Sequence, residues 1–218
     1  METQNSINEL IYLIAFTKLK GISDIDKKKL FIHLGSAQQV FEYCKSKQEL
    51  HHIYWPLEIA KREIDFISKH AIQSISILDK DYPQRLIHID DAPLLLYHKG
   101  KGNIHLPYLI SIVGTRNHTL YADKVIQELL EGIQHLNLGV VSGLALGIDG
   151  MVHQKACQLN ITNWGVIATG LDDIYPAQHQ RLANKMMETG GILTENTSNT
   201  QPLAFQFPKR NRIVAGMS

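Results

Sequence analysis

The chain has 218 residues, of which 44% are hydrophobic and 20% are charged, values that are ordinary for a soluble globular protein. This composition argues against a largely disordered chain. With 22 basic against 21 acidic residues, the formal net charge of +1 excludes a protein that is basic over its whole surface, so any nucleic-acid site must be a local patch.

Cysteine usage and hydropathy narrow the class further. Cys44 and Cys157 lie far apart, and neither belongs to a Cys-x-x-Cys pair, which argues against a zinc ribbon, thioredoxin-type chemistry and a disulfide framework. No apolar run approaches the roughly 20 residues of a membrane-spanning helix. The first five residues lack the basic region of a signal peptide. We therefore expect a cytoplasmic protein with no membrane partner.

The first 70 residues are predicted to form a small helical module. Apolar residues recur at roughly helical spacing up to Leu19, and Gly21 ends that run. Ser23 or Asp24 can cap the next helix, because short polar side chains accept hydrogen bonds from the free N–H groups of a first turn. A second break at Gly35 precedes a third helix.

Two features of this module bear on function. Its glycine turns resemble helix-hairpin-helix repeats, whose backbone N–H groups can meet DNA phosphates. Packing or partner docking is the preferred interpretation of the module. The three consecutive lysines at residues 27–29 are interpreted as a solvated helix face rather than as a ligand site.

From residue 72 onward, apolar strands alternate with amphipathic helices. We predict strands at residues 75–78, 94–97, 109–113, 140–141, 164–168 and 191–194, and helices at residues 119–136, 148–159 and 178–187. This alternation is typical of right-handed crossovers in an α/β fold with a doubly wound, mainly parallel sheet. The chain is therefore divided into residues 1–70 and residues 71–218.

In an open α/β sheet, ligands bind beyond the carboxyl ends of the strands. Four consecutive predicted strands of this chain end in glycine, hydroxyl, arginine or acidic residues, and glycines that open a helix suit anions because free N–H groups and the helix dipole favour negative charge. The segments are, in chain order, Gly114-Thr115-Arg116, Ser142-Gly143 with Gly147, Thr169-Gly170 and Glu195.

A basic cluster lies near the end of the chain. Lys209, Arg210 and Arg212 surround Asn211, and no acidic residue follows Glu195 to neutralise them nearby in sequence. Guanidinium groups match phosphate oxygens bidentately. Together with the arginine of the first glycine turn, the cluster predicts a site for the phosphates of a nucleic acid or a nucleotide.

Several enzyme classes lack their motifs in this chain. The turn at residues 114–116 is not Gly-x-Gly-x-x-Gly, no Walker lysine follows a glycine loop, and Ser142 is not in a Gly-x-Ser-x-Gly elbow. Asp149 and His153 are four residues apart and can share a helical face. A hydrogen bond that fixes the Ser142 loop is preferred over a metal pair. We predict no catalytic residue, no metal and no cofactor.

Five segments, taken in order, resemble the DprA/Smf DNA-processing family. They are SIVGTR at 111–116, VSGLALGID at 141–149 with His153, TGLDDIYP at 169–176, LTE at 193–195 and FPKRNRIVAGMS at 207–218. The upstream Asp81-Tyr82-Pro83 and the later APLL at 92–95 fit as well. The resemblance runs from about residue 75 to the last residue.

The resemblance implies an extended Rossmann-like sheet and a protein that is not an enzyme. Members bind single-stranded DNA in a basic pocket at one end of the sheet, help to load the RecA recombinase in natural transformation, and usually act as homodimers. By motif position, Arg116, Arg210 and Arg212 would contact phosphates. The remaining candidate DNA-binding residues in the same segments are Gly114, Thr115, Ser142, Gly143, Gly147, Lys209 and Asn211.

This chain also departs from the family pattern. Members often carry lysine after Tyr-Pro and shortly before Phe-x-Phe-Pro, where this chain has Ala177 and Ala204, so Lys209 and Arg181 become candidate substitutes. The family fold continues beyond the position of Ser218, so the domain is expected to be incomplete at its C-terminus. Sequence-independent, salt-sensitive binding is expected, with aromatic side chains as stacking candidates. These are Tyr175, Phe205 and Phe207.

One enzymatic alternative stays open. The lysine-decarboxylase-like phosphoribohydrolases also bind nucleotide phosphates with glycine turns on a related fold. They carry a Pro-Gly-Gly-x-Gly-Thr loop and a catalytic glutamate, and this chain has no such loop.

Overall fold

A computed structural model describes residues 2–48 and 50–218 and divides the chain into two compact units. One unit comprises Met1–Tyr82 with Ile87–Leu96, and the other comprises Pro83–Leu86 with Tyr97–Ser218. The division proposed from sequence, at residue 70, follows the change in hydrophobic period rather than the contacts, and it stays a prediction.

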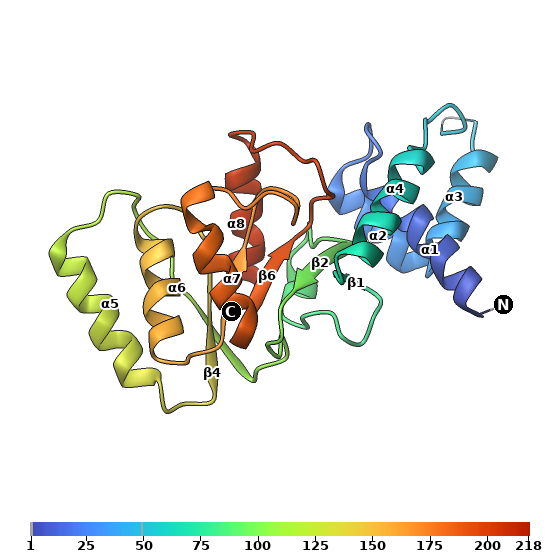
Figure 1. The fold of residues 1–218 in the computed structure, drawn as a ribbon. Coiled ribbons are helices and arrows are strands. Elements are labelled where there is room, and N and C mark those ends of the chain that lie inside the picture. Colours follow the sequence, from blue (N-terminus) through green and yellow to red (C-terminus); the bar gives the residue numbers. More distant parts are fainter. Residues whose placement is uncertain (1, 49) are drawn as a thin grey trace. The chain divides into compact units, whose positions relative to one another are not determined.

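The described first unit contains four helices, three of them near the positions that the sequence predicted and a fourth for which no position was predicted (Figure 1). Ser23 caps the second of them by accepting a hydrogen bond from Asp26 N at 3.1 Å. The first helix packs against the third and fourth and buries Ile14 and Phe16. The four helices are α1 (Glu2–Thr17), α2 (Asp24–Leu34), α3 (Ala37–Ser46) and α4 (Leu57–Lys69).

The interpretation of the lysine run on α2 as a solvated face is wrong. Lys27 is only 5% exposed, and its Nζ donates to Thr17 O at 3.0 Å, at the end of α1. Lys28 Nζ donates to Ile87 O at 2.7 Å and to Ile89 O at 2.6 Å. These ammonium groups satisfy carbonyl oxygens at a helix end and in a loop, while the apolar lysine stems are covered. Only the third lysine of the run is exposed.

The first unit also contains β1 (Gln73–Ser76) and the beginning of β2 (Leu95–Lys99). Next to β1, Ile77 N donates to Leu94 O at 2.9 Å, so the two segments run side by side. Between them, the fully buried Tyr82 donates from its hydroxyl to Pro93 O at 2.8 Å. This bond ties the Asp81-Tyr82-Pro83 turn to the segment that leads into β2.

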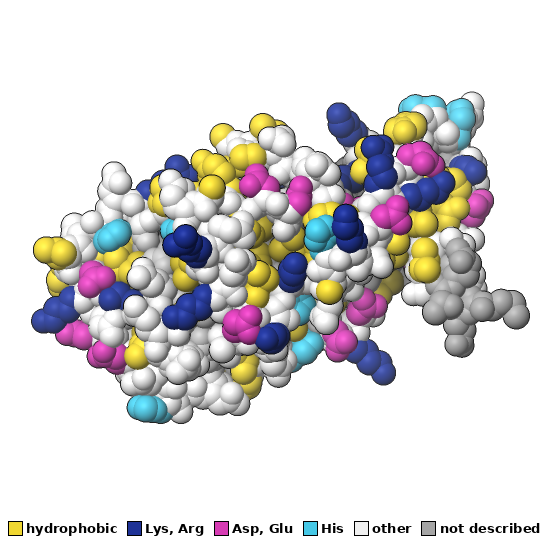
Figure 2. Space-filling view, viewed as in Figure 1, with side chains coloured by type: hydrophobic (Ala, Val, Ile, Leu, Met, Phe, Trp, Pro, Cys, Tyr) yellow, Lys and Arg dark blue, Asp and Glu magenta, His cyan; other side chains and the backbone are white. Residues whose placement is uncertain are grey.

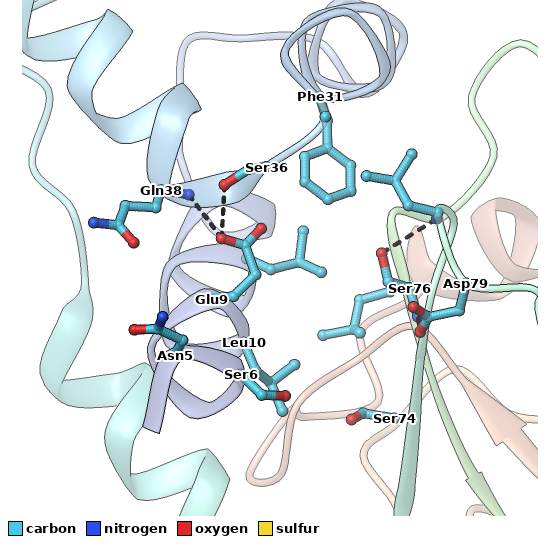
Figure 3. Close-up of a pocket in the computed structure, with 14 residues that line it drawn as sticks. Asn5, Ser6, Glu9, Leu10, Phe31, Ser36, Gln38, Ser74, Ser76 and Asp79 are labelled. Atoms are coloured by element: carbon cyan, nitrogen blue, oxygen red, sulfur yellow. Dashed lines mark hydrogen bonds between the residues drawn. The ribbon is translucent and has the colours of Figure 1, made fainter. Parts of the chain in front are cut away.

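A cavity of about 740 Å³ lies within the first unit, between α1 and the residues around β1 (Figure 3). On its wall, the Glu9 carboxylate accepts hydrogen bonds from Ser36 Oγ at 2.9 Å, from Gln38 N at 3.1 Å and from Ala37 N. The first N–H groups of a helix have no partner within the helix. Glu9 therefore satisfies two of them at the start of α3.

The sheet has the strand order β1-β2-β6-β5-β4-β3. In the second unit, β3 (Tyr108–Ser111), β4 (Leu138–Ser142), β5 (Asn163–Val166) and β6 (Gly191–Thr194) are parallel. β2 is antiparallel to β6, with Tyr97 opposite Thr194. The predicted α/β fold with a mainly parallel sheet is confirmed.

Helices cover this sheet and supply its core. α5 (Leu120–Ile133) and α6 (Ile148–Gln158) bury Leu130 and Val152 against Val140 of β4. α7 (Gln180–Thr189) follows the short turn η2 (Ala177–His179) and packs Met186 against Ile192 of β6. These helices begin or end within a few residues of their predicted limits.

A further helix, α8 (Gln206–Gly216), occupies the basic C-terminal segment, for which no helix was predicted. Ser111 Oγ of β3 donates to Val214 O of α8 at 2.6 Å, which joins this helix to the sheet. Both cysteines are free and buried. Among the described residues, no helix is long and apolar enough to cross a bilayer.

Candidate nucleic-acid interface

The carboxyl ends of β3, β4 and β5 open onto a cavity of about 650 Å³ in the second unit. A smaller cavity of about 50 Å³ shares part of its lining. The residues common to both are Arg116, Ala145, Tyr175, Phe207 and Arg210. Segments nearly 100 residues apart in sequence therefore meet at one sheet edge, as parallel strands require.

The turn after β3 presents an available cation. The Arg116 side chain is exposed and forms no ion pair within the described part of the chain. The turn is held by two backbone contacts: Ile148 N donates to Thr115 O at 3.1 Å, and Gly114 N donates to Asp149 Oδ1 at 3.3 Å. A fixed turn with an exposed guanidinium suits the binding of a phosphate from solvent.

Gly147, immediately before α6, has no room for a side chain. Its φ of +82° lies in the left-handed region that favours glycine. A Cβ there would also collide with the carbonyl oxygens of Thr115 and Arg116. The turn after β3 thus packs directly on the start of α6, and both belong to one rim of the cavity.

Arg210 of α8 is an internal link rather than a surface cation. It is 5% exposed, and its Nη1 donates to the carbonyl oxygens of Gly143 and Val166. Its Nε donates to Asn211 Oδ1 at 3.1 Å. Burial lowers the pKa of Arg210 to about 10, and the attraction of the Asp149 carboxylate opposes that shift. The group stays charged at neutral pH and joins α8 to the ends of β4 and β5.

Gly143 makes this arrangement possible. A Cβ at that position would lie 2.5 Å from Asp149 Oδ2 and 2.6 Å from Arg210 Cζ. Any larger residue would push apart the buried cation and its carboxylate. We infer that the glycine after β4 serves their close approach in addition to shaping the turn.

Arg212 is also neutralised within the protein. Its Nη2 lies 2.5 Å from Glu195 Oε2, and the two side chains are 14% and 15% exposed. No acidic residue lies close to the basic cluster along the sequence, but the fold brings Glu195 to Arg212. Glu195 follows β6 and pairs with Arg212, and Asp149 of α6 lies beside Arg210. Each acid is distant in sequence from its arginine, so the sequence alone does not reveal these contacts.

The remaining predicted site residues occupy different places. Gly114, Gly143 and Asn211 line one or other cavity. Lys209 is exposed on α8, Thr115 is exposed on the turn after β3, and the Ser142 side chain is fully buried. Within the described part of the chain, these three and Arg212 do not line the two cavities. Their predicted contacts with DNA stay predictions.

Two aromatic side chains form part of the wall. The rings of Tyr175 and Phe207 are 5.6 Å apart between centroids, at an interplanar angle of 58°. Tyr175 is 47% exposed and precedes the cis-proline Pro176. Phe205 is 66% exposed but lies outside both linings. An aromatic face beside Arg116 is suited to stack a base while the guanidinium meets a phosphate.

Asp149 and His153 do not act as a pair. No hydrogen bond joins them in the described structure. Asp149 accepts a hydrogen bond from Gly114 N, and His153 Nδ1 lies 3.0 Å from Asn163 Oδ1. Burial lowers the pKa of His153 to about 4, although the hydrogen bond to Asn163 opposes the shift. Its ring is therefore neutral near pH 7. The described residues include no group of three potential metal ligands.

The site is thus the edge of an α/β sheet with an exposed arginine, glycine turns at a helix start and an aromatic wall, an arrangement typical of proteins that bind phosphate-bearing ligands. The family model of DNA recombination-mediator protein A matches residues 73–218. The chain belongs to this family, which confirms the resemblance inferred from its motifs.

Relatives and solved structures agree. DNA processing protein DprA of Streptococcus pneumoniae is 35% identical over 174 residues, which are 80% of this chain and 60% of the relative. DprA of Bacillus subtilis is 39% identical over 151 residues, 69% of this chain and 51% of the relative. The chain therefore spans about half of the length of these relatives.

The X-ray structure of S. pneumoniae DprA superimposes with a TM-score of 0.64 at 38% identity, covering 71% of this chain and 55% of that one. A structure of Helicobacter pylori DNA processing protein A, described for its single-stranded DNA binding mode, gives a TM-score of 0.61 at 26% identity, covering 67% and 66%. The fold around the cavity is therefore that of DprA structures.

Proposed function

We propose that this chain binds single-stranded DNA at the cavity beside Arg116 and acts as a recombination mediator. The observation that carries the proposal is the exposed Arg116 side chain, which has no ion pair within the described residues and lines the same cavity as Tyr175 and Phe207. Membership in the recombination-mediator family and the likeness to a DprA structure described with single-stranded DNA support it.

The chemistry of the wall favours a single strand without sequence preference. A cation and an aromatic face can hold a phosphate and a base of any identity. A duplex keeps its bases stacked and paired, so its bases cannot reach the aromatic wall. Binding should weaken with salt, because neutralising phosphates releases counterions.

The test is a titration of labelled single-stranded and duplex oligonucleotides of equal length at two salt concentrations. We expect a clear preference for the single strand. The Arg116→Ala variant should weaken binding to all sequences about equally, and it should reduce the salt slope by about 0.7, the value for one phosphate contact in a single strand.

The matched control is Lys124→Ala, which removes one charge from the exposed surface of α5, where Lys124 lies 3.7 Å from Glu128. This control should bind like the wild type. Unchanged affinity in Arg116→Ala would refute the assignment of the cavity, and equal affinity for duplex and single strand would refute the proposed function.

The finer part of the proposal concerns partners. The bound strand would be protected and passed to the RecA recombinase in the cytoplasm, and the active form would be a homodimer, as the family resemblance implies. Strand exchange by RecA with and without the protein, and its mass by analytical ultracentrifugation, test these two points. No stimulation of RecA, or a monomer at all concentrations, would overturn the corresponding point.

The enzymatic alternative has no supporting observation at this edge. Asp149, the acidic residue in the described lining of the larger cavity, accepts from Gly114 N and lies beside Arg210. Its carboxylate is therefore engaged in holding the fold. Release of a free base from a nucleoside monophosphate would revive the alternative.

A further inference from the structure

We propose that the groove between α6 and α7 is a second DNA subsite, which carries the strand onward from the Arg116 cavity. The inference rests on the proposed function and deepens it. The groove has a volume of about 600 Å³ and lies in the second unit. Its lining includes His118, Gln154, Gln158, His179, Arg181 and Lys185.

The charge of this groove is positive and available. Arg181 and Lys185 are exposed and form no ion pair within the described residues. The acidic residue of the described lining, Asp123, lies 3.2 Å from Lys155 Nζ and is neutralised by it. Figure 2 shows Lys and Arg side chains on the face where Figure 1 places α6 and α7.

The spacing of the two cations favours a bound anion. Arg181 and Lys185 are one helical turn apart on α7, so their side chains lie on the same face. Like charges at this spacing repel each other and destabilise a helix. An anion held by both groups removes that repulsion. The phosphodiester backbone, with one charge per nucleotide, fits a pair of cations on one helix face.

The groove adjoins the cavity across a single rim. Arg116 lines the cavity, and His118, two residues further on, lines the groove. Gly147, which packs under the carbonyl groups of Thr115 and Arg116, belongs to the groove as well. A strand that leaves Arg116 therefore needs to cross only this turn to reach α7.

The two sides of the rim are fixed to each other. His179, just before α7, donates from Nδ1 to Leu144 O at 2.9 Å, in the loop between β4 and α6. Its ring also covers Gly150, where a Cβ would lie 2.8 Å from Nε2. The start of α7 is thus bonded to the loop that lines the cavity. This bond fixes the distance between the groove and the cavity.

The neutral part of the lining suits DNA. Gln154 and Gln158 on α6 bring amides that can donate to phosphate oxygens and accept from base edges. Amides of this kind discriminate little between sequences unless they are held rigidly. The groove therefore extends the contact length without adding sequence preference.

The experiment compares oligothymidylates of six and twenty nucleotides by fluorescence anisotropy. The variant is Arg181→Gln with Lys185→Gln. It should bind the 6-mer like the wild type and bind the 20-mer about 10-fold more weakly, with a salt slope lower by about 1.4 for two lost phosphate contacts. Arg116→Ala should weaken binding to both lengths.

Two controls separate a local contact from net charge. Lys101→Gln with Lys124→Gln removes the same charge from exposed ion pairs elsewhere in the second unit. Arg181→Lys with Lys185→Arg keeps the charge in the groove. Both control variants should bind the 20-mer within twofold of the wild type.

The outcomes are distinguishable. If the groove variant binds the 20-mer like the wild type, or no worse than the charge-matched control, the groove inference is overturned while the Arg116 site stands. An equal loss for both lengths overturns the idea of a separate subsite. If the wild type binds neither oligonucleotide, the proposed function itself fails, and this inference fails with it.

Discussion

At the scale of single residues, the arginines of the candidate site have different roles. Arg116 is exposed and has no ion pair in the described structure, whereas Arg212 pairs with Glu195 and Arg210 is buried beside Asp149. A count of positive residues in the motif therefore overstates the charge that DNA can meet. The available charge lies on the turn after β3 and along α7.

Arg210 should matter more for stability than for direct contact. Arg210→Ala would leave Asp149 as a buried carboxylate without its cation and would remove the donors to Gly143 O and Val166 O. Removing one partner of a buried pair costs about 3–5 kcal/mol. We expect the free energy of unfolding, measured with urea, to fall by about that amount.

Asn211→Ala serves as the comparison, because that side chain is exposed and its loss removes only the hydrogen bond to Arg210 Nε. This variant should lose about 1 kcal/mol. If Arg210→Ala is as stable as Asn211→Ala but loses DNA binding, Arg210 is a ligand contact and the structural role is wrong.

At the scale of elements, the spacing of hydrophobic residues predicted the strands of the second unit and all its helices but α8. Buried strands and amphipathic helices leave strong apolar patterns in the sequence. α8 was missed for a physical reason. It combines three cations with Pro208, and proline reads as a helix breaker. Pro208 lies in the first turn, where the absent N–H would have no partner within the helix anyway.

The site could be predicted only in part. The meeting of the glycine turns could be predicted from the sequence, because the carboxyl ends of parallel strands lie at one edge of a sheet. The partners of Arg210 and Arg212 were not, since Asp149 and Glu195 precede them by 61 and 17 residues and only the folded sheet brings them together. The buried lysine on α2 was missed for the same reason: its carbonyl partner belongs to another helix.

The start of α3 offers a test at this scale. Glu9→Ala removes the acceptor of three hydrogen bonds at the N-terminus of that helix. Loss of a capping interaction costs about 1 kcal/mol. We expect a lower free energy of unfolding with unchanged affinity for single-stranded DNA.

Glu58→Ala is the matched control, because its carboxylate is exposed and meets the exposed Lys61 at 2.7 Å. Surface pairs of this kind contribute little. A Glu9→Ala variant that is as stable as this control would show that Glu9 does not stabilise the start of α3.

At the scale of the whole molecule, stability should fall in mild acid. His153 is buried and neutral, and its pKa of about 4 lies below the ordinary value of 6.5. The unfolded chain then binds the proton more readily than the folded chain between these values. The free energy of unfolding must decrease as the pH falls from about 6.5 toward 4.

The whole of this shift corresponds to roughly 3 kcal/mol. Urea unfolding at pH 7, 6 and 5 measures it, with His153→Gln as the comparison. That variant carries no titrating group at the position, so its stability should depend less on pH over this range. Parallel pH dependence of the two proteins would show that His153 does not contribute.

The internal neutralisation of the C-terminal arginines has a kinetic consequence. A strand that meets few uncompensated charges at any one point is held by several weak contacts, each of which can open alone. Its residence time is then short, and a competing protein can invade from one end and displace the strand contact by contact. For a chain that binds single-stranded DNA as proposed, the pairing of Arg212 with Glu195 and the burial of Arg210 beside Asp149 would favour rapid exchange of the bound strand over its storage.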